Sequence, residues 1–111
     1  MKMAMRRVIL FTRKIDAMTA FYRDVMGLKL VTDEKGWKEL AAGGGVRIAL
    51  HSGPPTPPVK GPKLGFMTKD VAKLRETLNA RGGTFGKVRA GTYQLCDGKD
   101  PDGNVISLSN R

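Results

Sequence analysis

Few residues in this chain have side chains suited to catalysis or metal binding, and most of its charged residues are cations. The 111 residues include 20 Lys and Arg, 10 Asp and Glu, one histidine (His51) and one cysteine (Cys96). A lone cysteine forms neither an intramolecular disulfide nor a thiolate metal site by itself, and no base lies near it in the sequence. We therefore expect Cys96 to be a small core residue. A lone imidazole rarely binds a metal, so His51 is expected to be structural or to contact a ligand, with a catalytic base as the alternative.

The formal net charge of +10 predicts a surface that attracts anions. The basic residues are scattered, and their longest runs are the pairs Arg6-Arg7 and Arg13-Lys14. No zinc-finger spacing, RNP-like aromatic motif or helix-turn-helix pattern accompanies them. This pattern favours solvated faces or a small anionic ligand. Nucleic-acid binding through the general positive charge is a third-ranked alternative.

Composition predicts one cytoplasmic domain. The chain is 41% apolar and 27% charged, and no apolar run approaches the roughly 20 residues that cross a bilayer. Its first residues are not expected to act as a signal peptide. The breaker-rich stretch "GPPTPPVKGP" at 53–62 divides the domain into a first module, residues 1–52, and a second module, residues 63–111.

The two modules have matching patterns. In the first, an apolar stripe predicts a helix over 16–26: Met18, Phe21, Tyr22 and Val25. In the second, Asp70 is the expected N-cap of a helix that Gly82 and Gly83 end. Three pairs of positions lie 56 residues apart, which indicates an internal duplication: Leu10 and Phe66, Ile15 and Val71, Gly27 and Gly83.

Strand patterns surround both predicted helices, so each module reads as βαβββ. The expected strands are 7–12, 28–32, 37–42 and 46–51 in the first module, and 64–68, 84–88, 92–97 and 104–109 in the second. The fold class is therefore α+β, with two tandem modules forming a curved, partly open mixed sheet and one main helix per module.

The stretches "FYRDVMGLKL" and "DPDGNVISL", together with the repeat, resemble the vicinal oxygen chelate superfamily, which includes glyoxalase I, extradiol dioxygenases and bleomycin resistance proteins. The resemblance covers nearly the whole chain. It implies a homodimer, because small members of this kind generally pair. It does not imply one activity, since fold alone does not give function.

In metal-dependent members, four side chains hold one divalent metal, one from the first and one from the last strand of each module. By position, these places fall on Arg7, Ala49, Lys63 and Ser107. Arg and Lys offer only donors, Ala has no ligating atom and Ser is rarely a ligand. A shift of one residue offers no better set. We therefore expect neither a bound metal nor another cofactor.

Strand alternation places three cations on the face away from the helices: Arg7, Arg47 and Lys63. Glu39, on a neighbouring strand, could neutralise one of them. Aromatic and other side chains complete the candidate ligand-binding set, which is Arg7, Phe11, Trp37, Arg47, His51, Lys63, Met67, Tyr93 and Ser107. Guanidinium groups suit a carboxylate or phosphate, and the aromatic and methionine side chains suit a flat organic body.

The sequence therefore predicts a metal-independent protein that binds a small anionic, aromatic molecule in the groove of the curved sheet. The alternative is a glyoxalase- or dioxygenase-like enzyme with non-standard metal ligands or with His51 as base. A membrane partner is not expected.

Overall fold

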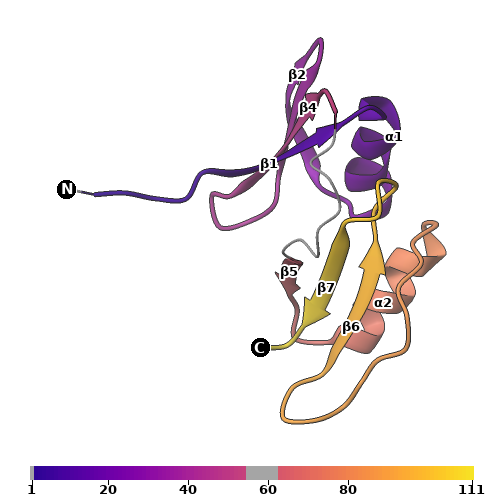
Figure 1. The fold of residues 1–111 in the computed structure, drawn as a ribbon. Coiled ribbons are helices and arrows are strands. Elements are labelled where there is room, and N and C mark those ends of the chain that lie inside the picture. Colours follow the sequence, from indigo (N-terminus) through magenta and orange to yellow (C-terminus); the bar gives the residue numbers. More distant parts are fainter. Residues whose placement is uncertain (1, 55–62) are drawn as a thin grey trace. The chain divides into compact units, whose positions relative to one another are not determined.

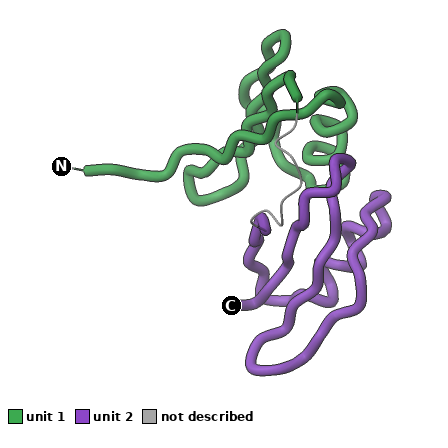
Figure 2. The backbone as a smooth tube through the Cα atoms, in the orientation of Figure 1, with its two compact units in different colours: residues 1–57 green, residues 58–111 purple. Residues whose placement is uncertain are grey.

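The computed structural model describes residues 2–54 and 63–111. The chain divides into two compact units, residues 1–57 and 58–111 (Figure 2). The boundary falls inside the proline-rich stretch at 53–62, most of which lies outside the described residues. The first unit contains the sequence of module 1, and the second contains that of module 2.

Module 1 contains a four-stranded mixed sheet and one helical segment (Figure 1). Its elements are β1 (Arg7–Thr12), α1 (Ile15–Ala20), η1 (Phe21–Val25), β2 (Lys29–Glu34), β3 (Trp37–Ala41) and β4 (Arg47–Ser52). The strand order is β1-β4-β3-β2, with β1 parallel to β4 and the other pairs antiparallel. α1 packs against β4, so one face of the sheet is covered by the helix.

The helix predicted over 16–26 is present over 15–25, but its second half is a π-helix. The amide of Met26 donates to the carbonyl of Phe21 at 3.0 Å, five residues back. Gly27, with φ of 75°, then ends the segment. The predicted stripe is only partly buried: Met18 and Tyr22 are fully buried, whereas Phe21 and Val25 are half-buried.

Module 2 contains a three-stranded mixed sheet and one helix (Figure 1). Its elements are β5 (Leu64–Met67), α2 (Val71–Ala80), β6 (Leu95–Lys99) and β7 (Val105–Ser109), with strand order β5-β7-β6. The predicted N-cap is confirmed, because Asp70 Oδ1 accepts a hydrogen bond from the Lys73 amide at 3.0 Å. The helix ends before Gly82, whose φ is 101°.

The predicted strand over 84–88 is wrong. Among the described residues, this stretch forms no strand; its Gly86 amide donates to the Asp97 carbonyl at 2.9 Å, and an isolated bridge, between Arg89 and Leu95, follows directly after it. The Asn79 side chain explains the difference. It accepts from the Phe85 amide at 2.8 Å and donates to the Phe85 carbonyl at 3.0 Å, so both groups are already paired and do not extend a β-ladder. The next predicted strand correspondingly begins at Leu95 rather than at residue 92.

The predicted fold class is confirmed: the chain is α+β, with an open mixed sheet and one main helix in each module. Each module has buried apolar residues of its own, for example Leu40 and Leu50 in module 1, and Ile106 and Leu108 in module 2. Cys96 is also fully buried, as expected, and burial raises the pKa of its thiol. Within residues 2–54 and 63–111, no helix has the length and apolar character needed to span a membrane.

Candidate functional site

The candidate site in module 1 lies on the sheet face opposite α1, which we call the open face of module 1. It consists of Arg7, Ile9 and Phe11 on β1, Trp37 and Glu39 on β3, and Arg47, Ala49 and His51 on β4. The register places these residues in rows across the strands, with Arg7 beside Arg47, Ile9 beside Ala49 and Phe11 beside His51. On β3, Glu39 lies beside Ala49 and Trp37 beside His51. The alternation predicted for these strands is therefore present.

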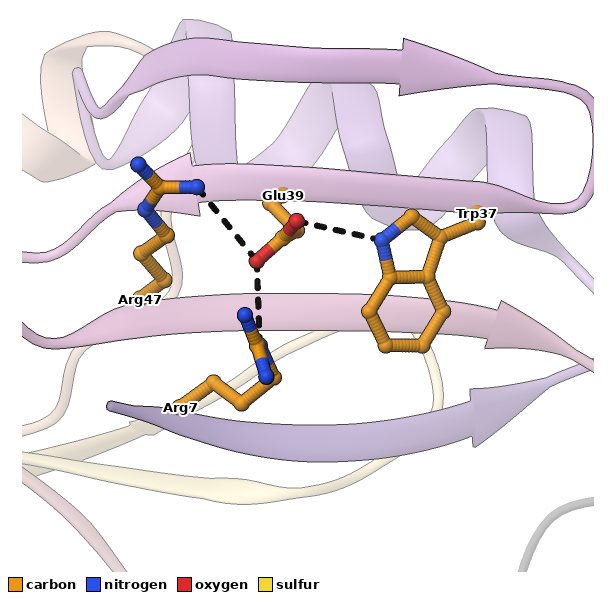
Figure 3. A network of polar contacts seen from close by, with 4 residues as sticks. All are labelled: Arg7, Trp37, Glu39 and Arg47. Atoms are coloured by element: carbon orange, nitrogen blue, oxygen red, sulfur yellow. Dashed lines mark hydrogen bonds and ion pairs between the residues drawn. The ribbon is translucent and has the colours of Figure 1, made fainter. Parts of the chain in front are cut away.

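A carboxylate organises the charged end of this face (Figure 3). Glu39 Oε1 accepts a hydrogen bond from Arg7 Nε at 3.1 Å, and Arg47 Nη1 lies 3.6 Å from the same oxygen. Glu39 Oε2 accepts from Trp37 Nε1 at 3.1 Å. Two guanidinium groups thus face one carboxylate, so the cluster has one net positive charge.

Glu39 is only 6% exposed, which is unusual for a glutamate. Burial alone would raise its pKa, but hydrogen bonds from Trp37, Arg7 and Thr32 and the positive charge of Arg7 outweigh burial and lower the pKa. The carboxylate is therefore ionised at neutral pH. It acts as a fixed counter-ion on the open face of module 1.

The other end of the open face of module 1 is aromatic. The His51 ring lies 5.0 Å from the Phe11 ring and 5.6 Å from the Trp37 ring, the second pair edge to face. Phe11 and Ile9 are 43% and 45% exposed. His51 Nδ1 lies 2.8 Å from the Ser52 carbonyl oxygen; because a carbonyl only accepts, Nδ1 is assigned the proton. These side chains give a flat organic molecule a surface on which to stack.

Module 2 has a similar arrangement on the face of its own sheet. Lys63, directly before β5, donates from Nζ to Asp97 Oδ2 at 2.9 Å, and Arg89 Nη2 lies 3.2 Å from the same oxygen. Burial acts to raise the pKa of Asp97, but hydrogen bonds from Lys63 and Ser107 and the charges of Lys63 and Arg89 lower it overall. Asp97 on β6 pairs in register with Ser107 on β7.

The two ion-pair clusters, one around Glu39 and one around Asp97, lie at equivalent positions of the internal repeat. Arg7 and Lys63 are 56 residues apart, while Glu39 and Asp97 are 58 apart, as are Ala49 and Ser107. Asp97 and Arg89 were not among the predicted site residues. Extending the repeat beyond the helices, with an offset of 58 in place of 56, would have paired Asp97 with Glu39. Arg89 had no such signal, because it lies in the segment wrongly predicted as a strand.

The structure thus places eight of the nine predicted residues on the two sheet faces, in two sets. The module 1 set is Arg7, Phe11, Trp37, Arg47 and His51, and the module 2 set is Lys63, Met67 and Ser107. Met67 is 68% exposed at the end of β5. Tyr93 lies in the loop before β6, where its ring is 5.5 Å from the Arg111 guanidinium carbon. Two shallow hollows lie elsewhere, along α2 and beside α1.

The residues at the four metal-ligand positions do not fit a divalent metal. Arg7 and Lys63 are donors engaged with Glu39 and Asp97, Ala49 has no ligating atom, and Ser107, beside Asp97 in register, is rarely a metal ligand. Among residues 2–54 and 63–111, no three His, Cys, Asp or Glu side chains form a group that could hold a metal ion. We derive no step through a metal.

Comparison with known protein families identifies the superfamily of this chain. Residues 4–108 match the Glyoxalase/Bleomycin resistance protein/Dioxygenase superfamily. The chain belongs to this superfamily. The predicted resemblance is confirmed, and the matched residues include both "FYRDVMGLKL" and "DPDGNVISL".

Solved structures of this superfamily's fold match almost the entire chain. The integron cassette protein VCH_CASS1 from the mobile metagenome of V. cholerae is 28% identical with a TM-score of 0.74, covering 98% of this chain and 96% of that one. TnmS3, an antibiotic binding protein from Streptomyces sp. CB03234, is 24% identical with a TM-score of 0.82, covering 96% and 94%. Lactoylglutathione lyase from Agrobacterium tumefaciens is 21% identical with a TM-score of 0.76, covering 96% and 92%. No curated protein sequence matches the chain.

Proposed function

We propose that this protein binds a small anionic, aromatic molecule without a metal, and that the open face of module 1 forms the core of the binding site. The observation that carries the proposal is that two features lie side by side on one sheet face. A partly exposed aromatic group, formed by Phe11, Trp37 and His51, lies beside the cluster of Arg7, Glu39 and Arg47, which has one net positive charge. An aromatic body would stack on the first, and its anionic group would meet the second.

The chemistry of the family's ligand positions supports metal independence. Two of the four residues at these positions, Arg7 and Lys63, are cations that are already paired with Glu39 and Asp97. The protein thus supplies its own fixed positive charges. Antibiotic binding by TnmS3, whose fold is similar, is a precedent for a binding role rather than catalysis.

We also propose that the whole chain is a single domain that acts as a cytoplasmic homodimer. A pair of copies would cover exposed apolar side chains outside the site, such as Met5 and Val31. Light scattering on the purified protein tests the assembly: about twice the 12.1 kDa mass of one chain is expected, and a monomer at all concentrations would exclude it.

Thermal unfolding against a panel of divalent metals and aromatic anions tests the binding function. At about 100 times its dissociation constant, a bound anion should add roughly 2.7 kcal/mol of stability. We expect naphthalene-2-sulfonate to raise the melting temperature and zinc, nickel and manganese to leave it unchanged. Stabilisation by a metal and by no organic anion would contradict the proposal and favour an enzyme with unusual ligands.

A metal-free enzyme with His51 as base is the second candidate. It is favoured by one observation: with the proton on Nδ1, toward the Ser52 carbonyl, the lone pair of Nε2 is available to accept a proton. Turnover of a bound ligand that stops in His51→Gln, while binding persists, would establish this candidate over simple binding.

A further inference from the structure

We propose that Glu39 sets the charge selectivity of the open face of module 1, so that the site takes aromatic molecules with a single negative charge and Arg47 receives that charge. This inference rests on the proposed function and names its ligand class more closely. It assigns Glu39 as a specificity-determining residue that does not itself bind the ligand. Arg7 becomes a positioning residue rather than the anion contact.

The two arginines differ in how firmly Glu39 holds them. Arg7 donates a hydrogen bond from Nε at 3.1 Å, which holds its guanidinium against the carboxylate and leaves only its Nη donors for another partner. Arg47 lies 3.6 Å away, beyond normal hydrogen-bond length, and among the described residues its guanidinium makes no hydrogen bond. Its donors therefore remain available for the two oxygens of a carboxylate or sulfonate.

Charge arithmetic limits what Arg47 can receive. Arg7 and Arg47 contribute two positive charges and Glu39 one negative charge, and Glu39 is nearly buried. A monoanion on Arg47 completes neutralisation of the cluster. A dianion would place its second charge close to the Glu39 carboxylate, where repulsion is poorly screened because solvent is largely excluded.

Glu39 also links the charged and aromatic ends of the site. Its Oε2 fixes the indole of Trp37, and the Trp37 ring contacts His51. Because one carboxylate holds both Arg7 and Trp37, the distance between charge and aromatic surface is fixed before a ligand arrives. Such preorganisation lowers the entropy cost of binding.

Trp37 provides a direct readout, because it is the only tryptophan in the chain. In a proton–nitrogen NMR spectrum, its indole Nε1–H gives a single cross-peak that reports both the hydrogen bond to Glu39 and a ring stacked nearby. Titration would use three probes with the same ring system at pH 7.5: naphthalene-2-sulfonate, 2-naphthyl phosphate and naphthalene-2-methanol. These are a monoanion, a species mostly dianionic and a neutral molecule.

We expect the sulfonate to bind about tenfold more tightly than the alcohol and also more tightly than the phosphate. Arg47→Gln should weaken sulfonate binding about tenfold and leave alcohol binding within about twofold. Arg47→Lys should recover only part of the loss, because lysine keeps the charge but lacks the paired N–H donors of a guanidinium. Arg13→Gln, which removes an exposed charge just after β1, is the matched control and should change none of the affinities.

Glu39→Gln tests selectivity itself. Glutamine keeps an oxygen for the Trp37 indole but removes the counter-charge, so phosphate affinity should rise about tenfold and overtake or equal that of the sulfonate. If the phosphate already binds wild type as tightly as the sulfonate, or Arg47→Gln acts no more than Arg13→Gln, this inference is wrong while aromatic binding stands. If none of the probes moves the indole peak at millimolar concentration, the proposed function fails with it. If Glu39→Gln does not fold, the wild-type preference for the sulfonate over the phosphate and the effect of Arg47→Gln still test the inference.

Discussion

Glu39 contributes to stability as well as to selectivity, and the direction of its pKa shift gives the pH range in which it does so. Its pKa is lowered in the folded state by Trp37, Arg7 and Thr32 despite burial. The pKa of a glutamate in an unfolded chain is about 4.3. Since the folded value is lower, the stabilisation is fully present above the unfolded pKa and is lost as pH falls through the folded one.

We therefore predict that Glu39→Gln lowers the free energy of unfolding at pH 7 by about 1–3 kcal/mol, because hydrogen bonds to a charged group are replaced by weaker ones. The difference from wild type should be smaller at pH 3, because the stabilisation by the ionised carboxylate is progressively lost once the pH falls below the unfolded pKa. Urea unfolding at both pH values measures this. Glu76→Gln, on the exposed side of α2, is the control and should change neither value. A difference that persists unchanged at pH 3 would mean that charge is not the cause.

At the scale of elements, the segment over 84–89 shows what a sequence pattern leaves out. Its alternation is that of a strand, but Phe85 is buried and its backbone is held by the side chain of Asn79 on α2. The ring of Phe85 lies against Gly98 on β6, where an added Cβ would come within 2.7 Å of a ring carbon. This close approach, together with the backbone bonds that Gly86 and Arg89 make to β6, holds the segment against the sheet.

Gly98→Ala should accordingly destabilise the protein by about 1–3 kcal/mol, the usual cost of overpacking a core. Gly65→Ala on β5 is a matched control, because an added Cβ there meets nothing within 4 Å. Thermal unfolding of both variants checks the prediction. Equal melting temperatures would show that Phe85 moves aside at little cost.

The N-cap of α2 is a second prediction at this scale. Asp70 accepts from the Lys73 amide at 3.0 Å, and its replacement leaves a helix N–H without that partner. Asp70→Ala should cost about 1 kcal/mol, and Asp70→Ser should restore most of it. Denaturant unfolding of the pair separates capping from charge, since serine caps without a carboxylate.

At the scale of the whole molecule, the duplication made most of the fold predictable. The 56-residue repeat placed both helices, the first strand of each module and the cations Arg7 and Lys63 at equivalent positions. The sequence did not reveal how far the cations are already paired. Whether Arg7 is free or bound to Glu39 depends on side-chain distances across three strands, and alternation gives only the face. The π-turn and the Asn79 contact were also missed, because each depends on a particular local hydrogen bond, Met26 to Phe21 and Asn79 to Phe85, that the spacing of apolar residues does not indicate.

The salt dependence of affinity should distinguish binding through the general charge of +10 from binding to the local charge of one site. A nucleic acid that covers many cations releases many counter-ions, so its affinity falls steeply with salt. A monoanion on Arg47 meets one net charge, so from 50 to 200 mM salt its affinity should fall by roughly twofold. Titrating naphthalene-2-sulfonate and a short DNA duplex over this range compares the two. If sulfonate affinity instead falls tenfold or more, the ligand is held by the diffuse positive field of the surface, and the cluster around Glu39 has no special role.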